Sequence, residues 1–298
     1  SFDFFSSSEI DFNENFSIKP GVRLSLTNLF GTQFYYSLSG RQLLKNNWEA
    51  RAVLGFGTRT PNYDELFTYF VDVNHDLRGN ENLKPEEGLS AFFHLKKQTD
   101  LNEDLSMKNK LTFSYIKVDD RIELTVINET PLQLLYNNID EFSSTGIALE
   151  NDFLYKNLQL NLGVSYFGIS RVLDYDTGEV SSNQSNFQLS SNMSYIIPGI
   201  HTSLTAYYKS IGATNRFIQV AGSFQNQKIN AYSWLDLTAS KQIFDKRVTI
   251  TLGVRNLFDV TDVNTSSITG GSHSGTNSTI SLGFGRSYFL KLAYNINI

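Results

Sequence analysis

The stretch from Gly55 to Glu86 holds the side chains whose types and spacing could bind a metal. Asp72, Asn74 and Asp76 occupy alternate positions, which is the spacing of the first three ligands in a calcium-binding loop. Such a loop also has a glycine at its sixth position and a glutamate at its twelfth. Here the following glycine is Gly79, and no glutamate stands at the twelfth position. We therefore expect no metal site and keep calcium only as a weak alternative.

Residues suited to catalysis do not cluster in the sequence. His94, His201 and His273 fall in separate predicted elements, without the spacing of metal ligands. The chain has no cysteine and no G-x-S-x-G motif, which leaves neither a thiolate nor a marked nucleophilic serine. We expect a protein that is not an enzyme and requires no cofactor. The net charge of −5 also argues against nucleic acid as a partner.

Alternation of apolar and polar residues with a period of two dominates the rest of the chain. In the best example, Leu158, Leu160 and Leu162 alternate with polar or small residues as far as Tyr166, which predicts one apolar face on a β-strand. The same pattern predicts strands near 16–26, 48–56, 89–95, 111–115, 147–153, 187–195, 204–208, 235–239, 248–254 and 288–298.

These strands predict a membrane barrel. Several run to about ten residues, the length of a tilted transmembrane strand. Their second face is rich in glycine, serine, asparagine and charged residues, and aromatic residues such as Trp48 and Tyr166 stand at strand ends, as in barrels with a wet interior and aromatic girdles. The predicted fold class is all-β, a transmembrane antiparallel β-barrel with about 13 strands present. The alternative is a large soluble all-β protein.

The connections between the predicted strands alternate between short and mostly long. The short ones are 42–46, 98–104, 156–157, 198–199 and 244–246, and the longer ones are 58–85, about 129–135, 171–183, 213–230 and 258–285. Outer-membrane barrels have short periplasmic turns and longer outer loops. This predicts that 58–85 lies outside the cell.

Two paired motifs resemble the signature of the TonB-dependent outer-membrane receptors. Gly55-Phe56-Gly57-Thr58-Arg59-Thr60-Pro61 is followed by Glu65-Leu66 and then by Gly79-Asn80-Glu81-Asn82-Leu83-Lys84-Pro85-Glu86. Near the end, Val254-Arg255-Asn256-Leu257-Phe258-Asp259 and Gly285-Arg286-Ser287-Tyr288-Phe289 resemble the family's last two strands. The resemblance covers essentially the whole chain in the right order.

The resemblance implies a barrel of 22 strands around an amino-terminal plug that engages TonB, in the outer membrane of a Gram-negative bacterium. We expect residues 1–298 to be the carboxy-terminal portion of that barrel domain, with the plug and about nine strands missing upstream. An odd number of strands would leave an open sheet edge, which cannot sit in lipid. In one departure from outer-membrane proteins, the chain ends on Ile298 rather than on an aromatic residue.

The expected ligand-binding residues lie in the outer loop: Arg59, Tyr63, Tyr69, Asp72, His75 and Arg78. Arg59 could instead form a salt bridge within the loop. In haem receptors of the family a loop histidine between the paired motifs ligates haem, and His75 lies at such a place. The first motif here lacks an aromatic residue directly before Arg59, and Glu81 replaces a proline in the second. An ordinary hydrogen-bonding role for His75 therefore stays open.

The resemblance implies active import of a scarce nutrient, bound at the outer loops and passed through the plugged barrel with energy from TonB. An iron–siderophore, haem, cobalamin or an oligosaccharide could be the cargo, so that haem or an iron chelate would be a transported ligand. The alternative is a passive porin or a surface ligand-binding barrel. The expected partners are the lipid bilayer with its lipopolysaccharide, TonB and the ligand, and a surface lipoprotein is a further candidate partner.

Overall fold

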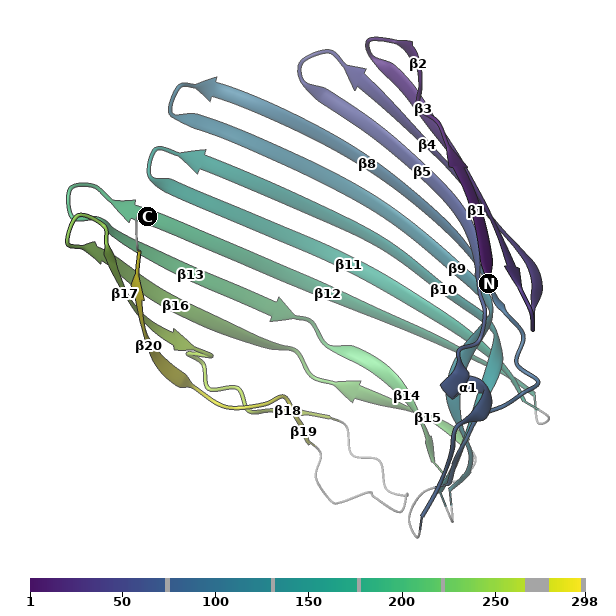
Figure 1. The fold of residues 1–298 in the computed structure, drawn as a ribbon. Helices are drawn as coiled ribbons and strands as arrows, with labels where there is room; N and C mark the ends of the chain where they lie inside the picture. The colour runs from purple at the N-terminus through teal and green to yellow at the C-terminus, as the bar shows by residue number, and fades with distance from the viewer. Residues whose placement is uncertain (73–75, 130–131, 176–177, 221–222, 266–278, 296–298) are drawn as a thin grey trace.

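The computed structural model describes residues 1–72, 76–129, 132–175, 178–220, 223–265 and 279–295. Thirteen strands follow one another in a single curved sheet, in which each strand pairs antiparallel with the next (Figure 1). In order, they are β1 (Phe2–Ser7), β3 (Phe16–Thr27), β4 (Gly31–Leu44), β5 (Trp48–Arg59), β8 (Glu86–Asn102), β9 (Leu105–Glu129), β10 (Leu132–Tyr155), β11 (Leu158–Tyr175), β12 (Gly178–Ile197), β13 (Thr202–Ile211), β16 (Tyr232–Ile243), β17 (Val248–Arg255) and β20 (Ser287–Tyr294).

The short strand β2 (Ile10–Asn13) also pairs with β3. The curved, antiparallel wall confirms the prediction of an all-β barrel fold with about 13 strands. Among the described residues, no helix combines the length and the apolar character needed to cross a membrane.

The sheet has one apolar and one polar face, as the alternation predicts. Leu149 lies opposite Val164 in the β10–β11 pair, and Ile147 lies opposite Tyr166. All four side chains are exposed. Few described apolar side chains are buried, and most large ones lie on the surface. An outward face of this kind fits contact with lipid rather than with a packed protein core.

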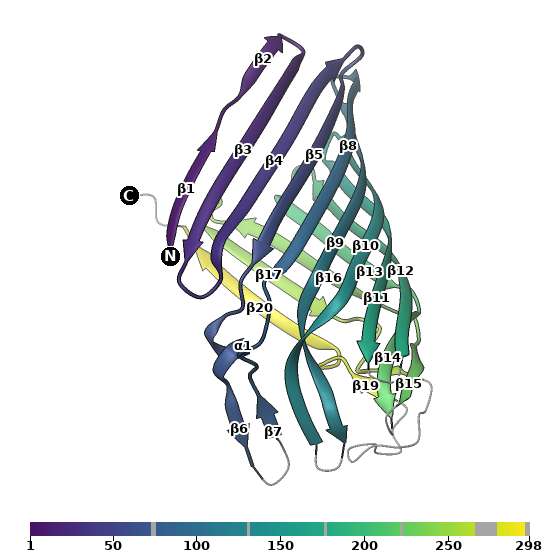
Figure 2. The ribbon, with the colours of Figure 1, turned by 90° about the vertical axis from the view of Figure 1, so that its right-hand side faces the viewer.

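The two ends of the strands differ in their connections. At one end, tight turns join the strands, with left-handed backbone at residues such as Asn46, Lys156 and Asp245. At the other end, the connections contain further elements (Figure 2). These are α1 (Tyr63–Phe67), β6 (Tyr69–Val71), β7 (Asp76–Arg78), β14 (Thr214–Val220), β15 (Ser223–Ile229), β18 (Asp262–Asn264) and β19 (Thr279–Ser281).

Two of the predicted long loops are mostly strand. Segment 129–135 falls largely in the hairpin of β9 and β10, and segment 171–183 falls largely in the hairpin of β11 and β12. In both hairpins the strands continue past the residues that alternate strictly. A prediction based on alternation therefore underestimates the length of the strands.

Candidate functional site

The connection between β5 and β8, residues 60–85, begins with a helix that is fixed by its first residues. Asn62 is the N-cap of α1, and its side chain accepts a hydrogen bond of 2.9 Å from the Glu65 backbone N–H. In return, the Asn62 backbone N–H donates to Glu65 Oε2 at 2.8 Å. This reciprocal capping box satisfies donors that a helix of only five residues would otherwise leave open.

Arg59 joins the two strands that flank this connection to the helix. Its Nη1 lies 2.9 Å from both carboxylate oxygens of Glu65, and its Nη2 lies 2.5 Å from Glu86 Oε1. The same oxygen of Glu86 accepts a hydrogen bond of 2.8 Å from the backbone N–H of Ile122 on β9. One arginine therefore holds the start of the connection, its helix and its end together.

This ion-pair network lies at the loop end of the sheet, since Arg59 is the last residue of β5 and Glu86 is the first residue of β8. Glu87 is the partner of Asp119 in the β8–β9 register and follows Glu86 at this end of the sheet. The hydrogen bond to Glu86 raises the pKa of the Arg59 guanidinium. Burial raises the pKa of the Glu86 carboxyl, but the hydrogen bonds from Arg59 and Ile122 outweigh it, so the pKa lies below its usual value. The pair is thus fully charged at neutral pH.

The second motif closes the connection against the helix. The backbone N–H of Gly79 donates to the carbonyl of Thr68 at 2.6 Å, and that of Asn80 donates to the carbonyl of Glu65 at 2.9 Å. A Cβ atom on Gly79 would lie only 2.5 Å from the carbonyl carbon and oxygen of Leu66. Only glycine allows this close approach of the two backbones.

The same motif also attaches the connection to β10. The Asn80 side chain donates to the carbonyl of Tyr136 at 2.9 Å, and the Lys84 backbone N–H donates to Asn138 Oδ1 at 2.9 Å. Beneath these bonds lies a small buried cluster, consisting of Leu66, Leu83 and Ile122 with Phe30 and Tyr136 packed against it. The residues of both motifs therefore determine the fold of the connection.

The hairpin formed by β6 and β7 extends from this base. Tyr69 pairs with Arg78 in the hairpin, and β7 pairs parallel with β10, where Asp76 lies opposite Gln133. The Asp76 carboxylate accepts hydrogen bonds from Arg78 Nε at 2.7 Å, from Arg78 Nη2 at 2.9 Å and from Gln133 Nε2 at 3.1 Å. The hydrogen bonds from Arg78 hold the pKa of Asp76 below its usual value, and Asp76 raises the pKa of Arg78.

The structure brings two of the predicted ligand-binding residues together. The Arg78 guanidinium lies 5.7 Å from the centroid of the Tyr69 ring, and Tyr69 is 73% exposed. Tyr63 is 75% exposed, with its ring 5.2 Å from that of Phe67 on the helix. An exposed aromatic surface of this kind, with a guanidinium group that is paired with Asp76 beside it, can bind a ligand by stacking.

The remaining predicted residues are placed differently. Arg59 is engaged by two carboxylates at the base of the connection, and Asp72 directly follows β6. His75 and Asn74 lie outside the described residues, so the haem and calcium hypotheses stay predictions. In the described part of the chain, no group of three or more His, Cys, Asp or Glu side chains is placed to hold a metal.

The inner, polar face of the sheet carries charged residues toward the turn end. The Glu49 carboxylate lies 3.4 Å from Arg41 Nε, 3.5 Å from Arg51 Nη2 and 3.7 Å from Lys96 Nζ. Lys110 pairs with a carboxylate on β10, Glu150, at 2.8 Å. These ion pairs are partly exposed, as expected for a water-filled interior.

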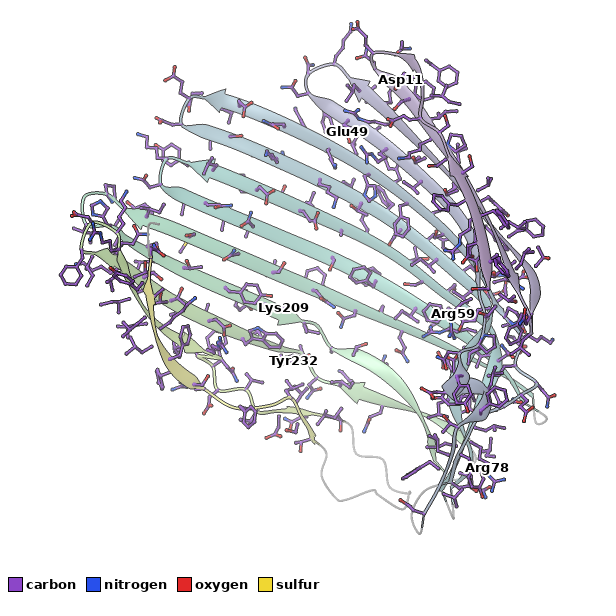
Figure 3. All side chains as sticks on the ribbon, viewed as in Figure 1. Asp11, Glu49, Arg59, Arg78, Lys209 and Tyr232 are labelled. Atoms are coloured by element: carbon purple, nitrogen blue, oxygen red, sulfur yellow. The ribbon has the colours of Figure 1, made fainter. Side chains whose placement is uncertain are left out.

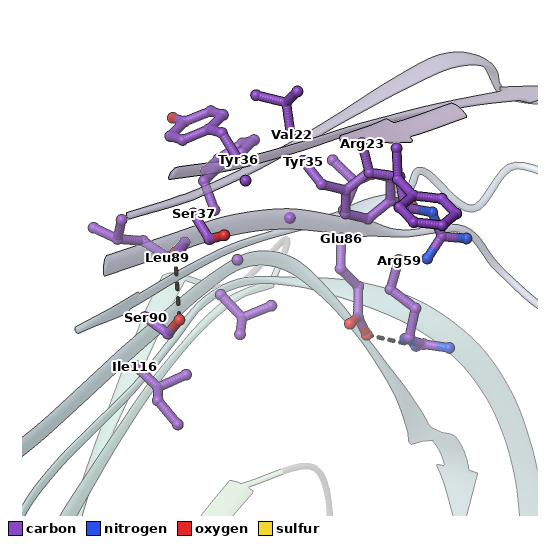
Figure 4. Close-up of a pocket in the computed structure, with 18 of the residues that line it drawn as sticks. Val22, Arg23, Tyr35, Tyr36, Ser37, Arg59, Glu86, Leu89, Ser90 and Ile116 are labelled. Atoms are coloured by element: carbon purple, nitrogen blue, oxygen red, sulfur yellow. Dashed lines mark hydrogen bonds and ion pairs between the residues drawn. The ribbon is translucent and has the colours of Figure 1, made fainter. Parts of the chain in front are cut away.

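A shallow hollow of about 550 Å³ lies at the part of the wall formed by β1, β3, β4, β5, β8 and β9. Small residues line it, among them Gly21, Ser37 and Ser90, and the ion pair of Arg59 and Glu86 lies at its loop end (Figure 4). The hollow thus reaches from the strands of the wall to the base of the connection 60–85.

The sequence reasoning did not identify the partners of Arg59 or the helix. The signal for the helix was present, since Asn62 followed three residues later by Glu65 is the pattern of a capping box. Exposed Phe67 and Phe70, which adjoin the predicted tyrosines, were also missed as surface residues. Their apolar character alone did not distinguish them from buried ones.

Comparison with known proteins matches residues 1–257 to the family model described as TonB dependent receptor-like, beta-barrel. Among solved structures, the siderophore receptor PirA from Acinetobacter baumannii is 15% identical with a TM-score of 0.71, over 98% of this chain and 45% of that chain. The ferric enterobactin receptor PfeA from Pseudomonas aeruginosa, crystallised as a mutant with enterobactin, is 18% identical with a TM-score of 0.69, over 97% and 44%.

The FrpB iron transporter from Neisseria meningitidis is 14% identical with a TM-score of 0.67, over 98% of this chain and 44% of that chain. At these identities the likeness concerns the fold alone. The chain spans less than half of the length of the solved proteins named here. No curated protein matches the sequence.

Proposed function

The chain belongs to the TonB-dependent receptor β-barrel family, and from this membership we propose that it serves an outer-membrane receptor that imports an iron–siderophore. Barrels of this family are outer-membrane proteins of Gram-negative bacteria, and the family and the named structures are transport receptors rather than enzymes. In the proposal, the outer connections bind the ferric chelate, and TonB supplies the energy for its passage through the lumen.

One observation carries the proposal at the level of residues. The exposed Tyr69 and the cation of Arg78 are presented on a hairpin that is bonded to β10, at the end of the barrel wall with the long connections. A ferric siderophore is commonly an anionic chelate with flat or ring-shaped parts, which this combination of ring and cation can bind. The hairpin is held in place, so little conformational entropy is lost on binding.

The structural relatives support an iron cargo. PirA is described as a siderophore receptor, PfeA as a receptor for ferric enterobactin and FrpB as an iron transporter. None of these three is a passive porin. Haem, cobalamin and oligosaccharides are the alternative cargoes, and the outward apolar face is proposed to contact lipid and lipopolysaccharide.

A growth experiment tests the proposal. A strain that lacks its own receptors would receive the gene for the full-length protein and be limited in turn for iron as a ferric siderophore, haem, cobalamin or glycan. We expect growth only with the ferric siderophore, and only when TonB is present. Growth restored by another nutrient would reassign the cargo, and growth without TonB would refute the energy coupling.

A further inference from the structure

A pair of aromatic rings lies on the inner face of the wall, far along the chain from the connection 60–85. The rings of Tyr232 and Trp234 on β16 lie 5.7 Å apart, with their planes inclined by 30°. Lys209 on β13 is the register partner of Trp234, and its Nζ lies 5.9 Å from the centroid of the Trp234 ring. Figure 3 shows Lys209 and Tyr232 near each other on these neighbouring strands.

The position of these residues in the register places them at the entrance to the lumen. Tyr232 pairs with Ile211 in the last rung of β13 and β16, directly before the β14–β15 hairpin. Leu235 and Leu237 alternate with the aromatic residues along β16 and belong to the opposite, outward face. The rings therefore face inward at the loop end, where a ligand released by the outer connections would arrive.

The neighbouring inner-face residues can form hydrogen bonds. Lys209 is paired with Ser190 on β12, and Tyr207 is paired with Asn192 on one side and with Asp236 on the other. Tyr207 is 37% exposed. By this register, residues with hydroxyl, amide and carboxylate groups share the inner face with the rings and with the ammonium group of Lys209.

This composition is unusual for the wet side of a barrel wall. In such barrels tryptophan gathers in the girdles at the lipid interface, as Trp48 does at the turn end of β5. A tryptophan on the inner face leaves apolar ring surface toward water, which costs free energy unless something covers the ring. The groups around Trp234 suit an occupant that has a flat face and a rim of oxygen atoms.

We propose that Tyr232, Trp234 and Lys209 form a stacking platform that binds a hydroxylated ring of the imported ligand. The flat face of the ring lies against Trp234, and Lys209 attracts oxygen atoms on its rim. A catecholate ring of an iron chelate and a sugar ring share this chemistry. The platform rests on the proposed function only in that a ligand enters through this lumen, and it does not require that the ligand carries iron.

Binding to the full-length receptor in detergent tests the platform. The probes are a ferric tris-catecholate and a linear glucose hexamer, each titrated by calorimetry into wild type, Trp234→Phe and Trp234→Leu. Phenylalanine keeps a stacking ring, whereas leucine fills similar space without one. For whichever probe the wild-type receptor binds, we expect Trp234→Leu to weaken the binding about tenfold or more. Trp234→Phe should retain most of the affinity.

A second tryptophan provides the matched control. The Nζ of Lys97 lies 5.1 Å from the centroid of the Trp48 ring. Trp48 thus has the same cation-and-ring chemistry as the platform but lies at the turn end of the wall. Trp48→Leu should leave both titrations unchanged. Lys209→Gln then distinguishes the two kinds of ligand. It should weaken binding of the anionic catecholate several-fold and change binding of the neutral hexamer little.

The results distinguish the platform from the proposed iron cargo. Equal affinities of Trp234→Leu and Trp234→Phe would overturn the platform, as would a wild-type receptor that binds neither probe. Loss of hexamer binding in Trp234→Leu, combined with no growth on ferric siderophore, would support the platform and refute the iron cargo. Normal growth on ferric siderophore, combined with unchanged binding in Trp234→Leu, would support the iron cargo and overturn the platform.

Discussion

Arg59 Nη2 lies 2.5 Å from Glu86 Oε1, and this contact joins the last residue of β5 to the first residue of β8. The ion pair closes the base of the connection, and Glu65 adds the helix to it. Of the two roles considered for Arg59, the salt bridge within the loop is the one that these contacts support. The arginine of the first motif and the glutamate of the second are therefore two halves of one structural unit.

Arg59→Ala should loosen the connection while the barrel wall still assembles. The substitution leaves the carboxylates of Glu65 and Glu86 unpaired, and their side chains are only 11% and 14% exposed. We expect a local cost of about 1–3 kcal/mol. Hydrogen exchange at the amide of Ile122, which donates to Glu86, should become faster.

The control for Arg59→Ala is Lys156→Ala at the turn end. Lys156 pairs with Asp104 at 3.5 Å, and both side chains are 55% exposed. Exposed pairs of this kind contribute little, so this variant should match wild type within about 0.5 kcal/mol. If exchange at Ile122 were the same in all three proteins, the arginine would not hold the connection.

Gly79→Ala should destabilise the connection because the added methyl group would meet the backbone of Leu66 at 2.5 Å. Backbone atoms cannot move aside as a flexible side chain can, so we expect a loss of about 1–3 kcal/mol. Thermal unfolding followed by protease cleavage within 60–85 would measure it. Gly40→Ala is the matched control, since nothing lies within 4 Å of a Cβ atom there, and its connection should be cleaved as in wild type.

Acid should release the β6–β7 hairpin from β10. The pKa of Asp76 is below its ordinary value of 3.8 in the folded hairpin, because of the hydrogen bonds from Arg78. Because the pKa of Asp76 is lower in the folded hairpin, its ionised carboxylate stabilises the hairpin at pH values above the ordinary pKa. This stabilisation is lost as the pH falls through the pKa of the folded state. Protection of the β7 amides, taken as the intrinsic exchange rate relative to the observed rate at the same pH, should therefore be high at neutral pH and fall below about pH 3.8.

Asp76→Asn removes the titrating group. In this variant, the protection of the β7 amides should already be lower at neutral pH and should change less between neutral and acid conditions. An acid response as large as that of wild type would show that another group controls the hairpin.

Replacing residues 69–78 by a single glycine should abolish ligand binding without preventing assembly. Gly79 donates a hydrogen bond to Thr68 across the neck of this segment, so the two ends are already neighbours and a short link can join them. The helix, Arg59 and the second motif all remain. Outer-membrane fractionation would measure assembly, and uptake of a ferric siderophore would measure function. Full uptake by the shortened protein would remove the hairpin from the binding site.

Much of the wall could be predicted from the sequence because a barrel strand is read by its alternation alone. Each residue of a run such as Leu158 to Tyr166 faces either lipid or water, and the period of two follows directly. The eleven segments predicted from alternation correspond to eleven of the thirteen strands in the sheet, and β1 and β4 are the two without such a segment. The alternation of short and longer connections along the chain also predicted that the longer ones share one end of the wall.

The connections could not be predicted in the same way. The sequence of the β14–β15 hairpin, Thr214–Ile229, shows no regular alternation that would have predicted its strands. The parallel pairing of β7 with β10 depends on contacts such as Asp76 with Gln133, which are 57 positions apart. Trp234 was missed for a different reason. The prediction followed the apolar face of its strand, Leu235 and Leu237, and treated the opposite face only as a surface in contact with water.

The pairing of β7 with β10 has a consequence for the order in which the protein assembles. The connection leaves β5 and returns at β8, but its hairpin bonds a strand that follows two places later. Those bonds cannot form until β8, β9 and β10 have all been added to the wall, and closing so long a stretch of chain is slow. We expect the connection to become resistant to protease only after the β9–β10 hairpin does, and pulsed proteolysis during refolding would reveal this order. On this expectation the connection is completed late, and its protease resistance would report that β8, β9 and β10 have all joined the wall.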